Sequence, residues 1–200
     1  MSMTEALLHK RLTETPEMEP CDGVKLLYQS QFGCGHLLPP DGQLAKRIRA
    51  ERNETPENAS LPPVSFIGNG LCRMNLAAPA VRALPPERLA RMMTLTAADV
   101  PPMQPGDERL PGFEQDLDGL RAAALAGRAR FSAAALDGYL AEYRAAGYPP
   151  ASHSPRYRAA YRPAYRVVSS DFAVLLPLLS AIEGRSAQGR PVLAVLDGPC

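Results

Sequence analysis

The sequence contains no apolar run of roughly 18 residues, the length that a membrane-spanning helix requires. Its first residues, Met1 to Glu5, also lack the basic flank and the apolar stretch of a secretory signal. No charge of one sign dominates, because 22 Lys and Arg residues stand against 21 Asp and Glu residues. We therefore expect a cytoplasmic chain with no membrane partner, and the near-neutral charge argues against nucleic acid as a partner.

Motifs of several enzyme classes are missing as well. The sequence has no Gly-x-Ser-x-Gly nucleophile motif and no complete dinucleotide-binding fingerprint. Its four cysteines, at positions 21, 34, 72 and 200, are scattered, which predicts reduced thiols rather than a disulfide framework. Cys34 and His36 lie two residues apart, and other cysteines and His153 could converge on them, but no Cys-x-x-Cys pair is repeated. We therefore predict no metal site.

Proline is abundant, with 21 of the 200 residues, about twice its usual share of ~5%. Because proline ends helices and has no amide hydrogen to donate, we expect short helices joined by proline-rich connections. Hydrophobic residues make up 46% of the chain, enough for a sizeable core. These properties predict a mainly α-helical module at residues 1–184 with a few short strands, proline-rich loops at 39–63 and 100–112, and a linker at 185–190.

Apolar spacing and capping residues locate the elements. Ser132 is a good N-cap residue, and its helix follows the preceding one closely enough for the two to pack as an antiparallel pair. Two short apolar runs around a Gly-rich turn predict a pair of strands within 64–76. The helix from Asp171 is expected to be buried and to break or bend at Pro177. The predicted helices cover residues 22–32, 44–52, 85–98, 113–127, 132–147 and 171–184.

The last ten residues have the pattern of a strand that ends in a turn. Residues 191–196 form an apolar run with β-branched content, and Asp-Gly-Pro-Cys follows. This pattern resembles the opening of the Walker A strand and loop in uridine-kinase-like and cytidylate-kinase-like P-loop proteins, with Asp197 and Gly198 at the start of the loop. By P-loop spacing, the phosphate-binding lysine would fall roughly four positions past Cys200. The alternative is a terminal strand that simply ends in a turn.

Two internal segments carry a second resemblance. Residues 27–36 (Leu-Tyr-Gln-Ser-Gln-Phe-Gly-Cys-Gly-His) and residues 153–158 (His-Ser-Pro-Arg-Tyr-Arg) look like the region before the P-loop in some bacterial uridine-kinase-like proteins. The resemblance implies an N-terminal helical module followed by a phosphotransferase domain that uses ATP and Mg²⁺. The Lys and the Ser/Thr of the motif are absent from residues 1–200, so we expect these residues to be inactive as a kinase and to hold neither cofactor.

Residues 153–166, which we call the Tyr-Arg segment, contain the highest concentration of polar and charged side chains suited to ligand binding. The dipeptide Tyr-Arg recurs there every four residues, after a Ser154-Pro155 pair that is typical of a helix start. At helical spacing the tyrosines share one face and the arginines the neighbouring one, until Pro163 breaks or kinks the helix. The segment contains no acidic residue. The arginine fork suits phosphate, and tyrosine can stack on a base or donate its hydroxyl.

Two interpretations of this segment stay open. In one, the tyrosines belong to the core and the arginines pair with carboxylates on neighbouring helices, such as Glu142 or Asp171. In the other, the segment joins His36 and Arg73 in one polar pocket for a phosphorylated small molecule or a nucleotide. The candidate ligand-binding residues are then His36, Arg73, His153, Ser154, Arg156, Tyr157, Arg158, Tyr161, Arg162, Tyr165 and Arg166.

Three classes of function follow from these observations. The favoured one is the N-terminal module of a uridine-kinase-like phosphotransferase. The alternative is a non-catalytic module that binds a phosphorylated or nucleotide-like ligand through the Tyr-Arg segment. The third is a purely structural helical domain.

Overall fold

The computed structural model describes residues 3–189 and 191–193, and most of these residues lie in helices. The helices are α1 (Met3–Glu14), α2 (Pro20–Phe32), the 3-10 helix η1 (Gly35–Leu37), α3 (Leu44–Glu54), α4 (Pro79–Arg82), α5 (Pro86–Asp99), α6 (Leu110–Leu125), α7 (Ala133–Ala145), α8 (Pro155–Tyr161) and α9 (Asp171–Ala187). The strands are β1 (Val64–Gly68), β2 (Leu71–Asn75) and β3 (Tyr165–Ser169). The predicted fold class, mainly α-helical with a few short strands, is confirmed.

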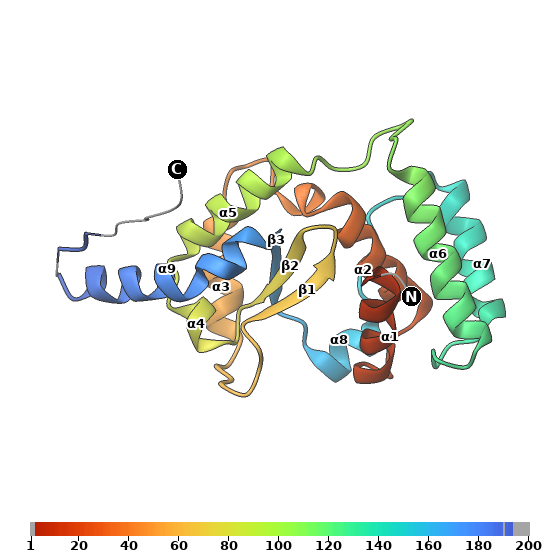
Figure 1. The fold of residues 1–200 in the computed structure, drawn as a ribbon, viewed down its shortest axis with the longest axis horizontal. Helices are drawn as coiled ribbons and strands as arrows, with labels where there is room; N and C mark the ends of the chain where they lie inside the picture. Colours follow the sequence, from red (N-terminus) through yellow and green to blue (C-terminus); the bar gives the residue numbers. More distant parts are fainter. Residues whose placement is uncertain (1–2, 190, 194–200) are drawn as a thin grey trace.

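A small sheet lies in the middle of the molecule, with α6 and α7 at one end and α9 at the other (Figure 1). The sheet is antiparallel, with the strand order β1-β2-β3. β1 and β2 form the hairpin predicted within 64–76, and the chain turns at Asn69 and Gly70, whose φ angles are 48° and 71°. Asparagine and glycine tolerate this left-handed conformation, which explains why the pair favours a two-residue hairpin turn.

The third strand corrects the helical interpretation of the Tyr-Arg segment. α8 ends at Tyr161, Arg162 has a left-handed backbone (φ 43°, ψ 56°), and Tyr165 and Arg166 belong to β3. Pro163 ends the helix as predicted, because it cannot donate a backbone hydrogen bond. The two valines that follow favour an extended chain, and β2 supplies the hydrogen-bonding partner that makes it a strand.

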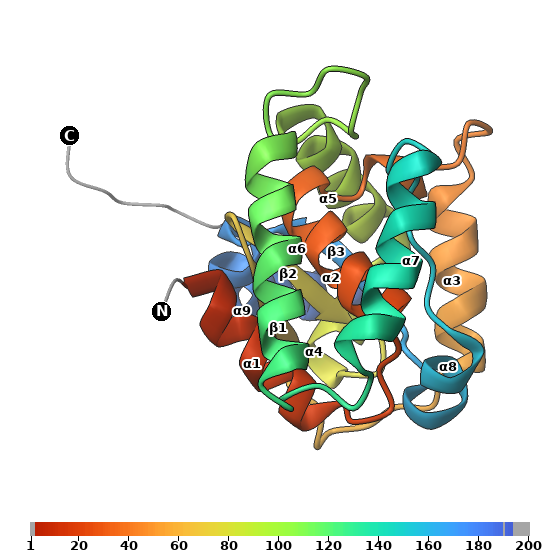
Figure 2. The same cartoon turned by 90° about the vertical axis from the view of Figure 1, so that its right-hand side faces the viewer.

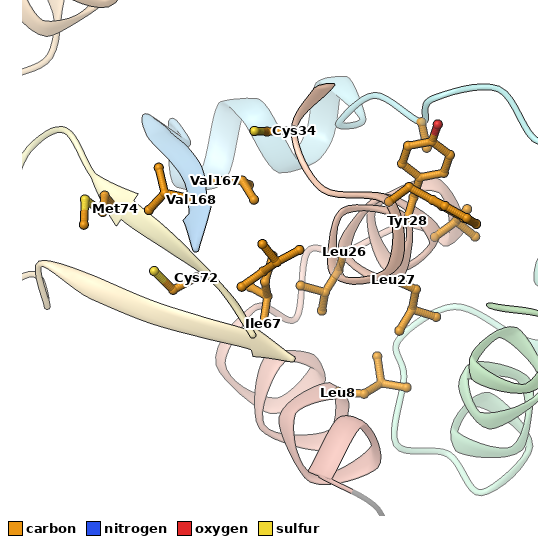
Figure 3. Close-up of a cluster of buried hydrophobic side chains, with 14 of the residues drawn as sticks. Leu8, Leu26, Leu27, Tyr28, Cys34, Ile67, Cys72, Met74, Val167 and Val168 are labelled. Atoms are coloured by element: carbon orange, nitrogen blue, oxygen red, sulfur yellow. The ribbon is translucent and has the colours of Figure 1, made fainter. Parts of the chain in front are cut away.

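One part of the core lies between α2 and the sheet. Figure 3 shows Leu26 of α2 directed toward Ile67 of β1, and Leu27 directed toward Leu8 of α1. α2 also packs against α6 and α7, so nearly all of its residues are buried. This central helix therefore carries into the interior even its polar residues, which are Asp22, Lys25, Gln29 and Ser30.

The predicted antiparallel pair is confirmed by α6 and α7, which lie side by side in two views (Figures 1 and 2). The Ser132 hydroxyl accepts a hydrogen bond from the Ala135 amide at 3.1 Å and caps α7, as its sequence predicts. Most other predicted helices agree with the structure to within a few residues at their ends, whereas α1 and α4 were not predicted.

α9 differs from the prediction in two ways. It runs unbroken through Pro177 and continues to Ala187, three residues into the segment predicted as a linker. It is also not buried: Leu176 is 3% exposed, but Val174 is 79% exposed. Its apolar composition suggested burial, yet only a narrow stripe of the helix meets the rest of the molecule. None of the helices in the described part of the chain is long and apolar enough to cross a membrane.

Candidate functional site

A network of buried hydrogen bonds joins the start of α2 to the start of α8. Its centre is Asp22, which is fully buried. One carboxylate oxygen accepts from His153 Nδ1 at 2.8 Å and from the Ser154 amide at 3.0 Å. The other accepts from the Ser154 hydroxyl at 2.7 Å and from the Glu19 amide at 3.0 Å. Ser154 in turn caps α8, since its hydroxyl accepts from the Tyr157 amide at 3.0 Å.

The network continues from His153 to β3 and β2. Because a carboxylate only accepts hydrogen bonds, Nδ1 of His153 carries the proton and Nε2 of the neutral ring accepts from the Tyr165 hydroxyl at 2.7 Å. The guanidinium of Arg73 lies over the Tyr165 ring, 4.2 Å from its centroid. Arg73 also donates to Gln29 at 2.8 Å. Asp22 and Arg73 are therefore connected through uncharged side chains rather than by a direct ion pair.

Charge in this region is distributed unevenly. Burial raises the pKa of Asp22, but the hydrogen bonds from His153, Ser154 and the Glu19 amide outweigh it and leave the pKa below its ordinary value. Burial lowers the pKa of His153, only partly opposed by Asp22. Burial, together with the charges of Arg73 and Arg158, lowers the pKa of Lys25 to about 8. The cationic side chains of this region, Lys25, Arg73 and Arg158, thus outnumber its single buried carboxylate, Asp22.

Beside this network lies a pocket of about 230 Å³, which we call the arginine pocket. It is bounded by α1, the β1-β2 hairpin and the chain from α8 to β3. The side chains that give it its chemistry are Arg11, Arg73, Tyr157, Tyr161, Arg162 and Tyr165. Within the described residues, no aspartate or glutamate lines it.

The three arginines of the pocket come from distant parts of the chain. Arg73 is 6% exposed, and in the described residues it forms no ion pair with a carboxylate. Burial, followed by the charge of Arg73, lowers the pKa of Arg11. Arg162 occupies the left-handed cap of α8, a conformation that costs a residue other than glycine roughly 1–2 kcal/mol. Arg11 pairs with Glu14 on its own helix at 3.7 Å, whereas Arg73 and Arg162 form no ion pair within the described residues. The fold therefore places more positive charge at the pocket than the described carboxylates neutralise.

The structure brings together only part of the predicted site. Arg73 and four of the candidate residues in the Tyr-Arg segment line the arginine pocket, and His153 contacts one of them, Tyr165, from behind. The other arginines of the segment lie elsewhere: Arg156 pairs with Glu17, Arg166 pairs with Glu51, and the exposed Arg158 donates to the His153 carbonyl. The carboxylate partners are thus not the predicted Glu142 and Asp171.

His36 does not line the arginine pocket, which corrects the hypothesis of a single pocket. It lies in η1 and lines a different cavity, together with Tyr28 and Tyr148. The glycines on either side of Cys34 do form a tight bend, as the sequence indicates, but this bend faces the loops at 101–106 and 147–150.

Sequence reasoning missed two residues of this region. Arg11 had no signal, because α1 was not predicted and the arginine stands in an ordinary polar sequence. Asp22 was marked only as the first residue of the helix predicted at 22–32. It does serve the start of α2, since it bonds the amide of the N-cap residue Glu19, but its contacts with His153 and Ser154 span more than 130 positions in the chain.

The described cysteines are free thiols. Cys34 and Cys72 are buried, and burial raises the pKa of each thiol to about 12. Glu19, Cys21 and Asp22 place ligand atoms within 4.8 Å of one another. Burial, with the charges of Asp22 and Glu19, raises the pKa of Cys21 to about 11, so its thiol is protonated at neutral pH and poorly suited to bind a metal.

No family model matches the chain, and neither a curated protein nor a solved structure matches it. The resemblance to uridine-kinase-like proteins therefore stays a prediction. The residues at the start of the predicted P-loop, Asp197 and Gly198, lie outside the described residues.

Proposed function

We propose that this chain is a module that binds a phosphorylated small molecule in the arginine pocket. The observation that carries the proposal is the meeting of Arg11, Arg73 and Arg162 at a pocket that no described carboxylate lines. A planar guanidinium presents paired donors that match the oxygens of a phosphate. A phosphate would supply a counter-charge for Arg73 and Arg162, which have no carboxylate partner within the described residues; Arg11 pairs with Glu14.

Arg73 makes the strongest case for an anionic ligand. A buried charge is unfavourable unless it is paired. In the described residues, the guanidinium of Arg73 has one hydrogen bond, to the Gln29 amide oxygen, and one cation–π contact, with the Tyr165 ring. Its Nε atom is buried and has no hydrogen-bond partner there. An anion beside the guanidinium would offset this cost.

The size of the pocket narrows the class of ligand. About 230 Å³ is below the ~300 to 1,000 Å³ of typical ligand pockets, so a sugar phosphate suits it better than a whole nucleoside triphosphate. Thr15, Ser65 and Asn75 also line the pocket and can hydrogen-bond the hydroxyls of a sugar. The rings of Tyr157 and Tyr161, tilted by 55° to one another, add apolar surface to the pocket.

Calorimetric titration with ribose 5-phosphate, with UMP and with free ribose tests the proposal. We expect the phosphorylated compounds to bind and ribose not to. Arg162→Ala should weaken binding by about tenfold or more, the value of one hydrogen bond to a charged group. Arg91→Ala is the matched control, because Arg91 is an exposed arginine of α5 outside the pocket. Absence of phosphate binding, or an equal loss in Arg91→Ala, would contradict the proposal.

The pattern of residues 191–200 supports a second proposal, that this module precedes a uridine-kinase-like P-loop domain. In that setting the intact protein would transfer a phosphoryl group from ATP with Mg²⁺. The DNA after the Cys200 codon tests it: codons for Gly-Lys-Ser/Thr at P-loop spacing would support the domain, and their absence would refute it. Residues 1–200 alone are expected to show no Mg²⁺-dependent ATP turnover.

A further inference from the structure

A second hollow, larger than the arginine pocket, lies between η1 and the loops at 101–106 and 147–150. Its volume is about 470 Å³, and we call it the histidine cavity. Its wall is mostly apolar and includes Tyr28, His36, Pro102, Met103, Leu110 and Tyr148. Three more prolines, from the same two loops, complete the apolar lining. A wall of this composition favours an apolar ligand.

The histidine cavity carries no charge. Within the described residues, no lysine, arginine, aspartate or glutamate lines it. Burial, aided by the charge of Lys25, lowers the pKa of His36 to about 4, so the imidazole is neutral at pH 7. An anion or a cation would lose its hydration here without gaining a counter-charge. The cavity therefore differs in kind from the arginine pocket.

His36 has unused hydrogen-bonding capacity. Both ring nitrogens are buried, and neither has a hydrogen-bond partner among the described residues. A neutral imidazole offers one donor and one acceptor, and burying such groups without partners is unfavourable. Most buried polar atoms in proteins are paired, so this pair of atoms requires an explanation.

The surroundings of His36 hold it at the wall of the cavity. Its ring stands nearly perpendicular to that of Tyr28, with the ring centroids 5.2 Å apart. The neighbouring Gly35 packs so tightly that an added Cβ would come within 2.8 Å of Pro102. The backbone of η1 therefore has little room to move toward a protein partner. A half-turn of the imidazole about χ2 exchanges each ring nitrogen with a ring carbon, and this motion needs no shift of the backbone.

We propose that the histidine cavity binds a small, uncharged, aromatic molecule with a hydroxyl or amide group, which forms a hydrogen bond with the imidazole of His36. The prolines, Met103 and the tyrosines hold the apolar body of the ligand. The imidazole of His36 forms the hydrogen bond with the polar group of the ligand. This site is independent of the arginine pocket and of the function proposed for that pocket.

Titration with 2-naphthol, followed by NMR of the histidine ring resonances, tests the proposal. We expect saturable binding that moves the resonances of His36, and no binding of the charged analogue naphthalene-2-sulfonate. His36→Phe keeps the apolar contact but removes the hydrogen bond, so its affinity should fall by about tenfold. Met103→Trp should abolish binding by filling the cavity, and circular dichroism verifies that each variant is folded.

Leu61→Trp is the matched control for the bulky substitution, because Leu61 lines the arginine pocket instead. It should leave 2-naphthol binding unchanged, and ribose 5-phosphate should not compete with 2-naphthol. Three results would overturn the proposal: no saturation below about 1 mM, binding that leaves the His36 resonances unmoved, or wild-type affinity in Met103→Trp. Equal affinity for the sulfonate would refute the assignment to an uncharged ligand.

Discussion

Replacing Asp22 by asparagine tests whether the buried carboxylate holds α2 and α8 together. Each of its oxygens accepts two hydrogen bonds, from His153 and the Ser154 amide on one side and from the Ser154 hydroxyl and the Glu19 amide on the other. In asparagine, one of the two positions becomes an NH₂ group, which donates. Whichever way the amide turns, one backbone amide, that of Ser154 or that of Glu19, faces another donor, and one side chain, His153 or the Ser154 hydroxyl, loses its acceptor.

The expected loss of stability follows from these contacts. A hydrogen bond to a charged group contributes about 1.5–3 kcal/mol, so the loss of two predicts a decrease of roughly 3–6 kcal/mol in the free energy of unfolding. This range agrees with the ~3–5 kcal/mol that breaking a buried charged pair costs. Urea denaturation at pH 7, followed by the helical signal in circular dichroism, measures it. The denaturation midpoint should shift while the slope stays the same.

Asp137→Asn is the control for the change of charge. Asp137 is exposed and pairs with Arg121 on the surface, where an ion pair adds little stability. Its substitution should therefore have a much smaller effect than that of Asp22. If Asp22→Asn destabilises the chain by less than about 1 kcal/mol, or no more than the control does, the network does not connect the two helices energetically.

Two further predictions concern pH and backbone conformation. Stability should fall as the pH drops from 6.5 toward about 4, because the unfolded chain protonates His36 near its ordinary pKa of 6.5 while burial holds the folded pKa near 4. The free energy of unfolding, measured by denaturation at pH values above and below this window, should depend less on pH in His36→Phe than in the wild type. The dependence that remains comes from His153, whose pKa burial also lowers. An unchanged pH dependence in the variant would contradict the assignment to His36. Gly33→Ala should destabilise the chain more than Gly42→Ala, although both glycines have positive φ, because only at Gly33 would the new Cβ lie 3.2 Å from Val100. Equal melting temperatures of the two variants would show that the contact yields without cost.

Elements with local signals could be predicted from the sequence. The Ser132 cap, the Asn-Gly turn and Pro86 at the start of α5 each act within a few residues, so their positions follow from the chain itself. β3 could not be found in this way, because its hydrogen-bonding partner is β2, which lies at least 90 positions earlier in the chain. The burial of α9 was predicted wrongly for a related reason: apolar composition indicates what a helix can cover, whereas tertiary packing decides what it does cover.

In the candidate site too, the residue types could be predicted from the sequence, whereas their arrangement in space could not. The chemistry of the Tyr-Arg segment and of Arg73 was visible as residue types, and the structure places several of these residues at one pocket. The separation of His36 from that pocket was not visible, because a glycine-rich bend indicates a turn but not the surface that the turn faces. Arg11 joins the site only because α1 lies beside the sheet, a contact between elements that local sequence does not encode.

The arrangement of Asp22 and Arg73 bears on why the arginine pocket stays positively charged. A direct ion pair between them would neutralise Arg73 and leave the pocket with less affinity for an anion. Instead, the Asp22 carboxylate accepts hydrogen bonds from His153, from Ser154 and from the start of α2. His153 and Tyr165 lie between this carboxylate and the guanidinium of Arg73. The network therefore fixes the position of Tyr165, and through its ring that of Arg73, without cancelling the guanidinium charge. Buried charge without a partner lowers stability, and proteins accept such costs mainly at functional sites. If the pocket binds a phosphate, as proposed, the phosphate offsets the unfavourable free energy of the unpaired Arg73 charge. By mass action, the bound ligand also stabilises the folded chain, and the stabilisation increases with its affinity.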